Sequence, residues 1–220
     1  MDIILGLNFG HPDSSACLVI EGVLVGAVSE ERFGDRIKNT SKFPSNSIKW
    51  LLESNNIQPK DITYVAIGRN TQANLAAKFK YVLSKPKKSY KAVYEHFKRR
   101  KKTGLLKEKI SEIFGTDPRA CNFQTIGVEQ HLAHISSSYY LSPFETTTAG
   151  ISYDASGDFA SFMAANCEGS KIKILDRVKL PHSLGFFYTA MCQFIGFDNF
   201  GEEYKVMGLA PYGNDNYSEL

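Results

Sequence analysis

The 220-residue sequence predicts an α/β protein built on a mixed, twisted β-sheet. Short apolar runs bounded by polar turns predict strands, and the first of these runs covers residues 3–8. Apolar residues at helical spacing predict helices between the strands. The order strand, polar turn, strand, tight turn, strand occurs in residues 3–28 and again in residues 148–174. At roughly 150 residues per domain, this length fits one large domain or two small ones.

The first half of the chain predicts a hairpin unit followed by alternating helices and strands. Residues 21–22 are a short turn with glycine between two apolar runs, which is typical of a hairpin. Pro44 suits the first turn of a helix, and Leu51 and Leu52 continue its apolar face from Ile48. The expected elements are, in order, strands at 3–8, 16–20 and 23–28, a helix at 45–54, a strand at 62–67, a helical region at 72–114 interrupted near Pro86 and Gly104, a strand at 123–128 and a helix from 129 to 140.

The second half repeats the opening pattern. Strands are expected at 148–153, 159–167 and 171–175, with a polar turn at 154–158 and a tight turn at 168–169. Asn8 precedes Glu21 by 13 residues, and Asp154 precedes Glu168 by 14, so the spacing predicts a structural duplication. A helix follows at 183–195, with Ser183 as its cap.

Composition narrows the class of protein. The net charge of +3 combines a basic segment from Lys78 to Lys109, with a net charge of +11, and a remainder with a net charge of −8. We expect this segment to be a solvated helical insertion. No apolar run is long enough for a transmembrane helix, the N-terminus does not resemble a secretory signal, and the four cysteines are isolated. These features predict a cytoplasmic protein with reduced cysteines.

Two polar turns form the first candidate site. A turn rich in Gly, Ser and Asp exposes backbone N–H groups that can cradle phosphate, and a nearby carboxylate can hold a metal ion. The matched turns at 10–15 and 154–158 would lie on duplicated halves that face one cleft, as in the actin-like ATPases and sugar kinases. The alternative is that each is a simple turn between strands.

Histidines and one lysine are the other candidates for chemistry. His11 lies in the first polar turn and could act as a general base near neutral pH. His131 and His134 can share one helix face, which permits metal binding but equally fits one packed ring and one solvated ring. Lys38 follows a run of mixed charges, a pattern typical of a solvated surface.

Five motifs in order resemble those of the carbamoyltransferases of nodulation-factor and antibiotic biosynthesis. Each motif alone is a weak signal, and their order from residue 5 to residue 213 makes the resemblance specific. The motifs are Leu5-Gly6-Leu7-Asn8-Phe9-Gly10-His11 with Asp13-Ser14-Ser15-Ala16, Glu30-Glu31-Arg32-Phe33 with Arg36, Lys38 and Phe43-Pro44, Glu129-Gln130-His131-Leu132-Ala133-His134, Asp154-Ala155-Ser156-Gly157-Asp158, and Gly201-Glu202-Glu203-Tyr204-Lys205-Val206-Met207-Gly208-Leu209-Ala210-Pro211-Tyr212-Gly213.

The resemblance implies a duplicated, actin-like and ribonuclease H-like fold, related to the enzyme that transfers threonylcarbamoyl groups to tRNA. It implies that a C-terminal half makes carbamoyl-adenylate from carbamoyl phosphate and ATP, and that the N-terminal half transfers the carbamoyl group to a substrate hydroxyl. Iron, or another divalent metal, and the nucleotide would lie between two lobes. The implied residues are His11 and Lys38 for catalysis, Asp13, Ser14, Ser156, Gly157 and Lys205 for nucleotide binding, and His131, His134 and Asp154 as metal ligands.

The sequence departs from the family pattern in two ways. The family has Glu-His-His-x-x-His with metal ligands four residues apart, whereas here Gln130 stands at the first ligand position and His131 at a non-ligand position. The family also continues far beyond the last motif. We therefore expect 1–144 to be a first lobe with a basic helical insertion at 72–114, and 145–220 to be the start of an incomplete second lobe.

The implied chemistry is coherent with these residues. A hydroxyl that attacks a carbamoyl carbonyl needs a base, for which His11 is the candidate. Lys38 or a metal could stabilise the charge on the carbonyl oxygen and the leaving phosphate. The alternatives are a non-catalytic nucleotide- or partner-binding module, which Gln130 favours, and RNA binding by the basic segment.

The expected partners follow from the same reasoning. They are a small molecule with a hydroxyl group and the adenylate-forming C-terminal domain. An exposed edge of the incomplete second sheet could also pair with a second copy of the chain as a homodimer. We expect no membrane partner and no nucleic-acid partner.

Overall fold

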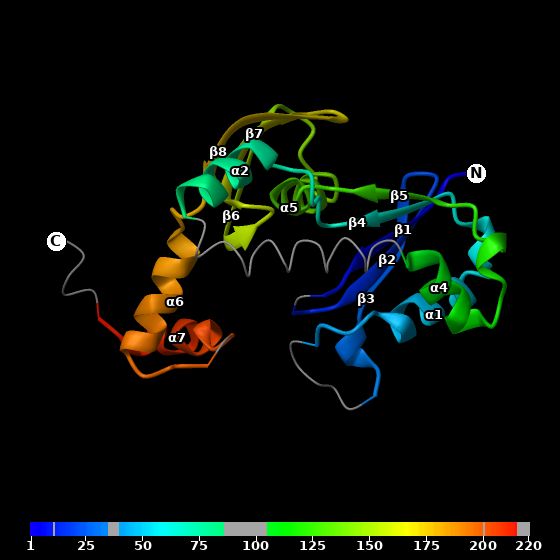
Figure 1. The fold of residues 1–220 in the computed structure, drawn as a ribbon, viewed down its shortest axis with the longest axis horizontal. Coiled ribbons are helices and arrows are strands. Elements are labelled where there is room, and N and C mark those ends of the chain that lie inside the picture. Colours follow the sequence, from blue (N-terminus) through cyan, green and yellow to red (C-terminus); the bar gives the residue numbers. More distant parts are fainter. Residues whose placement is uncertain (11, 35–39, 86–104, 200, 215–220) are drawn as a thin grey trace.

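The computed structural model describes residues 1–10, 12–34, 40–85, 105–199 and 201–214. The described residues form two sheets, one of five strands in the order β3-β2-β1-β4-β5 and one of three strands in the order β6-β7-β8 (Figure 1). Strands β1, β4 and β5 are parallel to one another, and β2 is antiparallel to both β1 and β3. This mixed sheet, with its helices, confirms the predicted α/β fold class.

The first sheet and its helices lie close to their predicted positions. All five strands and α1 agree with the predictions to within two residues at each end. The elements are β1 (Ile3–Asn8), β2 (Ser15–Ile20), β3 (Val23–Ser29), a 3-10 helix (Glu30–Arg32), α1 (Ser45–Ser54), a 3-10 helix (Pro59–Asp61), β4 (Tyr64–Ile67), α2 (Leu75–Ser84), α4 (Leu106–Phe114), a 3-10 helix (Pro118–Ala120) and β5 (Gln124–Gly127). The helices α2 and α4 confirm the two ends of the predicted helical region, whose central residues 86–104 lie outside the described residues.

The main core lies on one face of the first sheet. Every second residue of β1, namely Ile3, Leu5 and Leu7, is buried there. This alternation is the pattern of a strand with one covered face. The cover is α1, which packs on β2 and β3, together with α4, which packs on α1. This cluster is the larger of the two buried apolar clusters of the described residues, and its burial favours folding.

The second half begins with a helix and continues as a three-stranded meander. Its elements are α5 (Gln130–Tyr139), β6 (Thr148–Gly157), β7 (Ala160–Glu168), β8 (Lys171–Lys179), α6 (Leu184–Phe194), α7 (Glu203–Leu209) and a 3-10 helix (Ala210–Tyr212). Ser183 caps α6 as predicted, because its hydroxyl accepts a hydrogen bond from the Phe186 N–H at 3.1 Å. Ile135 on α5, which precedes residue 144, packs with the second sheet. The predicted domain boundary at 144 stays a prediction.

The predicted duplication is visible in the two meanders. Both are antiparallel, and both have a two-residue turn after the middle strand, at residues 21–22 and 169–170. Each also has a register shift in the middle strand, between Leu18 and Val19 in β2 and between Ala164 and Ala165 in β7. The two meanders therefore share the geometry of their strand pairing as well as the order of their strands.

The predicted polar turn at 154–158 is wrong. Strand β6 continues to Gly157 with an irregular register after Tyr153, and the turn consists of Asp158 and Phe159 alone. Both turn residues have positive φ angles, 49° and 73°, which tight hairpins require. The polar composition of 154–157 reflects a strand bulge. Strand β8 is also longer than predicted, since it reaches Lys179.

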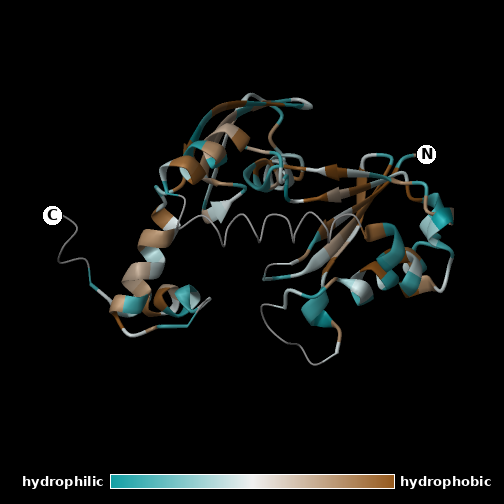
Figure 2. Ribbon diagram, viewed as in Figure 1, coloured by the Kyte–Doolittle hydropathy of each residue, from teal (hydrophilic) through white to brown (hydrophobic). Residues whose placement is uncertain are grey.

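The second sheet buries a much smaller core than the first. One face packs Met163, Ala165 and Cys167 against Ile135 of α5. The opposite face of this sheet is open, since Ile151 and Tyr153 of β6 are 62% and 72% exposed. Figure 2 shows hydrophobic residues along α6 as well, and many of them are exposed. The apolar surface of this half is thus only partly covered within the described residues.

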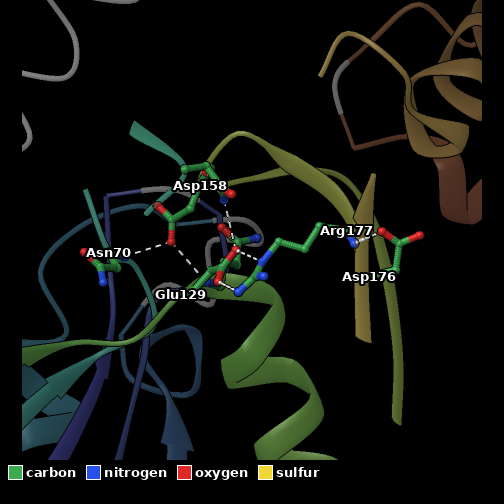
Figure 3. Close-up of polar contacts among 7 residues, drawn as sticks. Asn70, Glu129, Asp158, Asp176 and Arg177 are labelled. Atoms are coloured by element: carbon green, nitrogen blue, oxygen red, sulfur yellow. Dashed lines mark hydrogen bonds and ion pairs between the residues drawn. The ribbon is translucent and has the colours of Figure 1, made fainter. Parts of the chain in front are cut away.

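The carboxylate of Asp158 joins the two sheets (Figure 3). Its Oδ2 accepts one hydrogen bond from the backbone N–H of Asn70, after β4, at 2.7 Å, and another from that of Gln130, at the start of α5, at 3.0 Å. The Asp158 carbonyl accepts a third bond from the Asn74 side chain at 3.1 Å. One turn residue therefore caps α5 and holds the β6–β7 hairpin against the end of β4.

Burial raises the pKa of the Asp158 carboxyl above its ordinary value. The hydrogen bonds from Asn70 and Gln130 and the charges of Lys78 and Arg69 oppose this shift without cancelling it. Because the folded protein then binds this proton more tightly than the unfolded chain, Asp158 favours folding most at low pH. Its contribution is lost as the pH rises through the raised pKa.

A second buried carboxylate, that of Glu30, holds the first turn of α1. Glu30 is 8% exposed, and its two oxygens accept the backbone N–H groups of Asn46 at 3.1 Å and Ser47 at 2.9 Å. They also accept the side-chain donors of the same two residues, at 2.8 Å and 2.7 Å. Glu30 therefore caps α1 from a distant position in the sequence, and it ties the end of β3 to this helix.

We expect Glu30→Ala to destabilise the chain by about 2–3 kcal/mol, because two N–H groups of α1 lose their acceptor. Urea unfolding at neutral pH measures this loss. Glu31→Ala is the matched control, since Glu31 accepts none of the four bonds. An equal loss in both variants would contradict the capping role.

We expect Asp158→Asn to remove a pH dependence of stability while keeping an acceptor for the two N–H groups. Relative to this variant, the native chain should lose stability from about pH 4 upward, until the raised pKa has been passed. Urea unfolding across pH 4 to 7 tests this, with the exposed Asp176→Asn as control. Parallel curves for the native chain and Asp158→Asn would refute the sign of the shift.

Candidate functional site

The candidate site lies where the parallel strands of the first sheet end. Strands β1, β4 and β5 are parallel, so their carboxyl ends, at Asn8, Ile67 and Gly127, share one edge of the sheet. Open α/β sheets bind ligands at such an edge. The turn residue Asp158 of the second sheet reaches the same edge through Asn70 and Gln130. We call this region the strand-end edge.

The opening loop is held firmly at this edge. Ser14 is fully buried, and its hydroxyl donates a hydrogen bond to the Lys42 carbonyl at 2.5 Å. Its backbone N–H donates to the Thr40 carbonyl at 3.0 Å. The Ser14 hydroxyl therefore pins the loop to the segment after β3 and is turned away from solvent. Asp13 is exposed at φ 65°, and its carbonyl accepts the Asn8 side chain at 2.9 Å.

The two predicted catalytic residues, His11 and Lys38, lie outside the described residues. Their neighbours in the sequence show how the two motifs meet. The Gly10 N–H donates to the Ser41 carbonyl at 3.2 Å, and the Glu30 N–H donates to the Ser14 carbonyl at 2.8 Å. The opening motif and the second motif thus contact each other through backbone hydrogen bonds.

The histidine motif places its residues in different surroundings. His131 is completely buried, and its Nδ1 lies 2.9 Å from the Ser152 hydroxyl on β6. Its Nε2 has no hydrogen-bond partner among the described residues. His134 is exposed, with its ring centroid 6.3 Å from that of His131. The packed ring and the exposed ring match the structural alternative considered for this pair.

Gln130 and Asp154 are brought together. The Gln130 side-chain amide donates to Asp154 Oδ2 at 3.0 Å, and Asp154 Oδ1 accepts the Ala155 N–H at 2.6 Å. Gly157 makes room for this contact, because a Cβ there would lie 2.7–2.9 Å from three carbons of the Gln130 side chain. Ser156, the neighbouring predicted nucleotide ligand, is exposed.

The donor set around Asp154 does not fit the iron or other divalent metal that the resemblance implies. The Gln130 side chain turns its amide N–H, and not its oxygen, toward Asp154 Oδ2, and an amide nitrogen that carries two hydrogens is not a metal ligand. Across the described ranges, no group of three His, Cys, Asp or Glu side chains is placed to hold a metal ion. The structure therefore does not assemble His131, His134 and Asp154 into the predicted ligand set.

Lys205, the last predicted nucleotide ligand, lies on α7 and is paired. Its Nζ contacts Glu202 Oε1 at 2.5 Å. The hydrogen bond from Lys205 lowers the pKa of the Glu202 carboxyl to about 2, and the same bond raises the pKa of Lys205. A phosphate that binds Lys205 would have to share this ammonium group with Glu202.

Sequence reasoning missed a second polar cluster beside Asp158 (Figure 3). Glu129, at the start of the histidine motif, is 8% exposed and accepts two hydrogen bonds from Arg177 of β8, at 2.8 Å and 3.1 Å. Asn74 donates a third at 3.0 Å. Burial raises the pKa of the Glu129 carboxyl, but these bonds and the Arg177 charge outweigh it, so the pKa lies below its ordinary value. The cluster links α5, β8 and the segment before α2.

Lys78 is another residue that sequence reasoning missed at this cluster. Its Nζ donates to the Thr71 carbonyl at 3.0 Å. Burial lowers the pKa of the Lys78 ammonium group, although the charges of Asp158 and Glu129 oppose the shift. Glu129 and Asp158 each belong to one of the five sequence motifs. Nothing in the sequence linked them to Asn74, Lys78 or Arg177.

A cavity of about 430 Å³ lies apart from these candidate residues, between α1 and α4. None of the predicted site residues lines it. Its lining residues are Phe43, Ser45, Asn46, Lys49, Lys109, Glu112 and Ile113. The sequence motifs therefore direct attention to the strand-end edge and not to this cavity.

Comparison with known proteins identifies relatives over the full chain. The chain is 31% identical to an uncharacterised protein of Synechocystis sp. over all of its length, and 35% identical to the nodulation protein NolNO of Sinorhizobium fredii over 94% of its length. It covers 36% and 28% of these two relatives, so it spans about a third of their length. It is also 39% identical to the nodulation protein NolO of Bradyrhizobium diazoefficiens over 42% of the chain, which covers 17% of that protein.

Among solved structures, YeaZ from Pseudomonas aeruginosa matches 82% of this chain and 68% of its own chain, with 12% identity and a TM-score of 0.43. The family model described as the carbamoyltransferase N-terminus matches residues 3–220. This match includes all five sequence motifs, in the order that the resemblance predicted. The chain therefore belongs to the carbamoyltransferase N-terminal family.

Proposed function

We propose that this chain is the acceptor half of an O-carbamoyltransferase, which transfers a carbamoyl group from carbamoyl-adenylate to a hydroxyl group of a small molecule. The family match over residues 3–220 carries this proposal. The geometry supports it at one point, since the opening loop, the start of α5 and the β6–β7 turn converge on the strand-end edge.

In this proposal the strand-end edge binds the nucleotide part of carbamoyl-adenylate. Asp13 and Ser156 are exposed there and are available to contact a ligand, whereas Ser14 organises the loop through its backbone and its buried hydroxyl. Gly157 leaves space for the Gln130 side chain. Lys205 would contribute positive charge from α7 toward a phosphate.

The chemical step is assigned to the two sequence-predicted residues. His11 takes the proton of the attacking hydroxyl, whose oxygen forms a bond to the carbamoyl carbon. The carbamoyl carbon then releases AMP, and Lys38 stabilises the developing negative charge. No step requires a metal ion. The adenylate-forming activity is assigned to the C-terminal half that the family resemblance implies, and this chain spans about a third of the length of its relatives.

The cellular location and the oligomeric state of the chain are also proposals. A cytoplasmic location and homodimer formation stay predictions. None of the helices in the described part of the chain is long and apolar enough to cross a membrane. The four cysteines are free, as the sequence predicted.

We expect His11→Ala in the full-length protein to lower carbamoyl transfer by about 10²–10⁴-fold, the range for loss of a general base. The assay supplies ATP and carbamoyl phosphate with a panel of simple sugars and polyols, and mass spectrometry detects the carbamoylated product. The control is His182→Ala, an exposed histidine beyond β8. Equal transfer rates in the two variants would remove His11 from the mechanism.

We expect Lys205→Ala to weaken ATP binding by about tenfold, because one charge-assisted contact to phosphate is lost. Isothermal titration calorimetry on the chain measures this dissociation constant directly. Lys171→Ala, an exposed lysine at the β7–β8 turn, is the matched control. The assignment fails if both variants bind ATP as the native chain does.

A further inference from the structure

The link between α5 and the bulge of β6 depends on one side chain, Gln130. Its backbone N–H is bound by Asp158, and its side chain lies against Gly157. Its amide then reaches Asp154 Oδ2 at 3.0 Å. Asp154, Gly157 and Asp158 thus set the position of Gln130, and these contacts restrict its side-chain rotamers.

Asp154 is equally constrained from its other side. Its Oδ1 accepts the Ala155 N–H, and its carbonyl accepts the Ser183 hydroxyl at 3.3 Å. The Ser183 hydroxyl also lies 2.7 Å from the Ala155 carbonyl. Gly185 packs directly on this bulge, since a Cβ there would lie 2.4 Å from the Ala155 nitrogen. The Asp154 segment therefore connects α5, through Gln130, to the start of α6.

We propose that the Gln130 amide serves as a built-in replacement for a metal ion, clamping Asp154 between α5 and α6 so that this site works without a bound metal. In this structure the amide N–H, and not a cation, satisfies Asp154 Oδ2. The amide performs this task without a third ligand, which agrees with the absence of a three-ligand cluster among the described residues.

His134 is exposed, and within the described residues it belongs to no group of three His, Cys, Asp or Glu side chains that could hold a metal ion. His134 lies one helical turn after Gln130, so the two side chains lie on the same face of α5. A histidine in place of Gln130 would therefore put two imidazoles on one face of α5, with the Asp154 carboxylate beside the first of them. Such a set is a normal one for zinc or cobalt.

The first test is metal binding by the 220-residue chain, which does not depend on the proposed transfer reaction. Cobalt(II) is added to the native chain, to Gln130→His and to Gln124→His, an exposed control on β5. We expect cobalt absorption bands and a raised melting temperature with zinc only for Gln130→His. The proposal is overturned if the native chain binds cobalt and Asp154→Ala abolishes that binding, or if Gln130→His gains none.

The second test is a double-mutant cycle between Gln130→Ala and Asp154→Ala, followed by urea unfolding in the presence of a chelator. We expect the two side chains to be coupled by about tenfold in the unfolding equilibrium constant, the scale of a hydrogen bond to a charged group. Asp154→Asn, which keeps an acceptor oxygen, should recover part of the loss. Additive single losses would show that Gln130 does not clamp Asp154.

Discussion

The arrangement of this molecule depends on the Asp158 carboxylate. The first N–H groups of a helix have no partner within the helix, and a buried one is costly unless an acceptor is supplied. Asp158 supplies that acceptor to α5 and, with the same oxygen, to the loop after β4. Because Asp158 itself lies in the turn of the second sheet, this contact sets where the second sheet meets the first.

The neighbouring polar contacts reinforce the same junction. Glu129 accepts hydrogen bonds from Arg177 of β8 and from Asn74 before α2. The Glu129 carboxylate near Asp158 therefore pairs with groups from two other parts of the chain. Such a network is stable only when each buried polar group has a partner. One apolar contact lies beside them, since the ring of Phe159 in the same turn packs edge-on against Tyr81 of α2. The junction therefore combines directional polar contacts with this ring contact.

Family membership and site chemistry have to be separated in this chain. The family model covers nearly the whole sequence, yet Gln130 stands at a position that the resemblance assigns to a metal ligand. The structure shows a hydrogen bond to Asp154 at that position. A shared fold with shared motifs does not by itself guarantee the same cofactor.

Periodicity in the sequence was sufficient to find the eight strands and most of the α-helices of the described residues, although it did not predict α7. Alternation in 3–8 and helical spacing in 45–54 depend only on which residues are buried, and the structure buries those residues. The same reasoning failed at 154–157, because a bulged strand and a turn have similar polar compositions. The family resemblance assigned Ser14 to nucleotide binding, and the sequence alone does not show that its hydroxyl donates to the Lys42 carbonyl.

By itself, the sequence determined the α/β class, the repeated meander, the order of the five motifs and the substitution at Gln130. Each of these is local, because it depends on spacing along the chain. Only the tertiary structure decided that Asp158 caps α5, that Arg177 pairs with Glu129 and that Gln130 meets Asp154. These contacts join residues that are 24 to 48 positions apart, and their partners are selected by how two sheets pack, which no local pattern encodes.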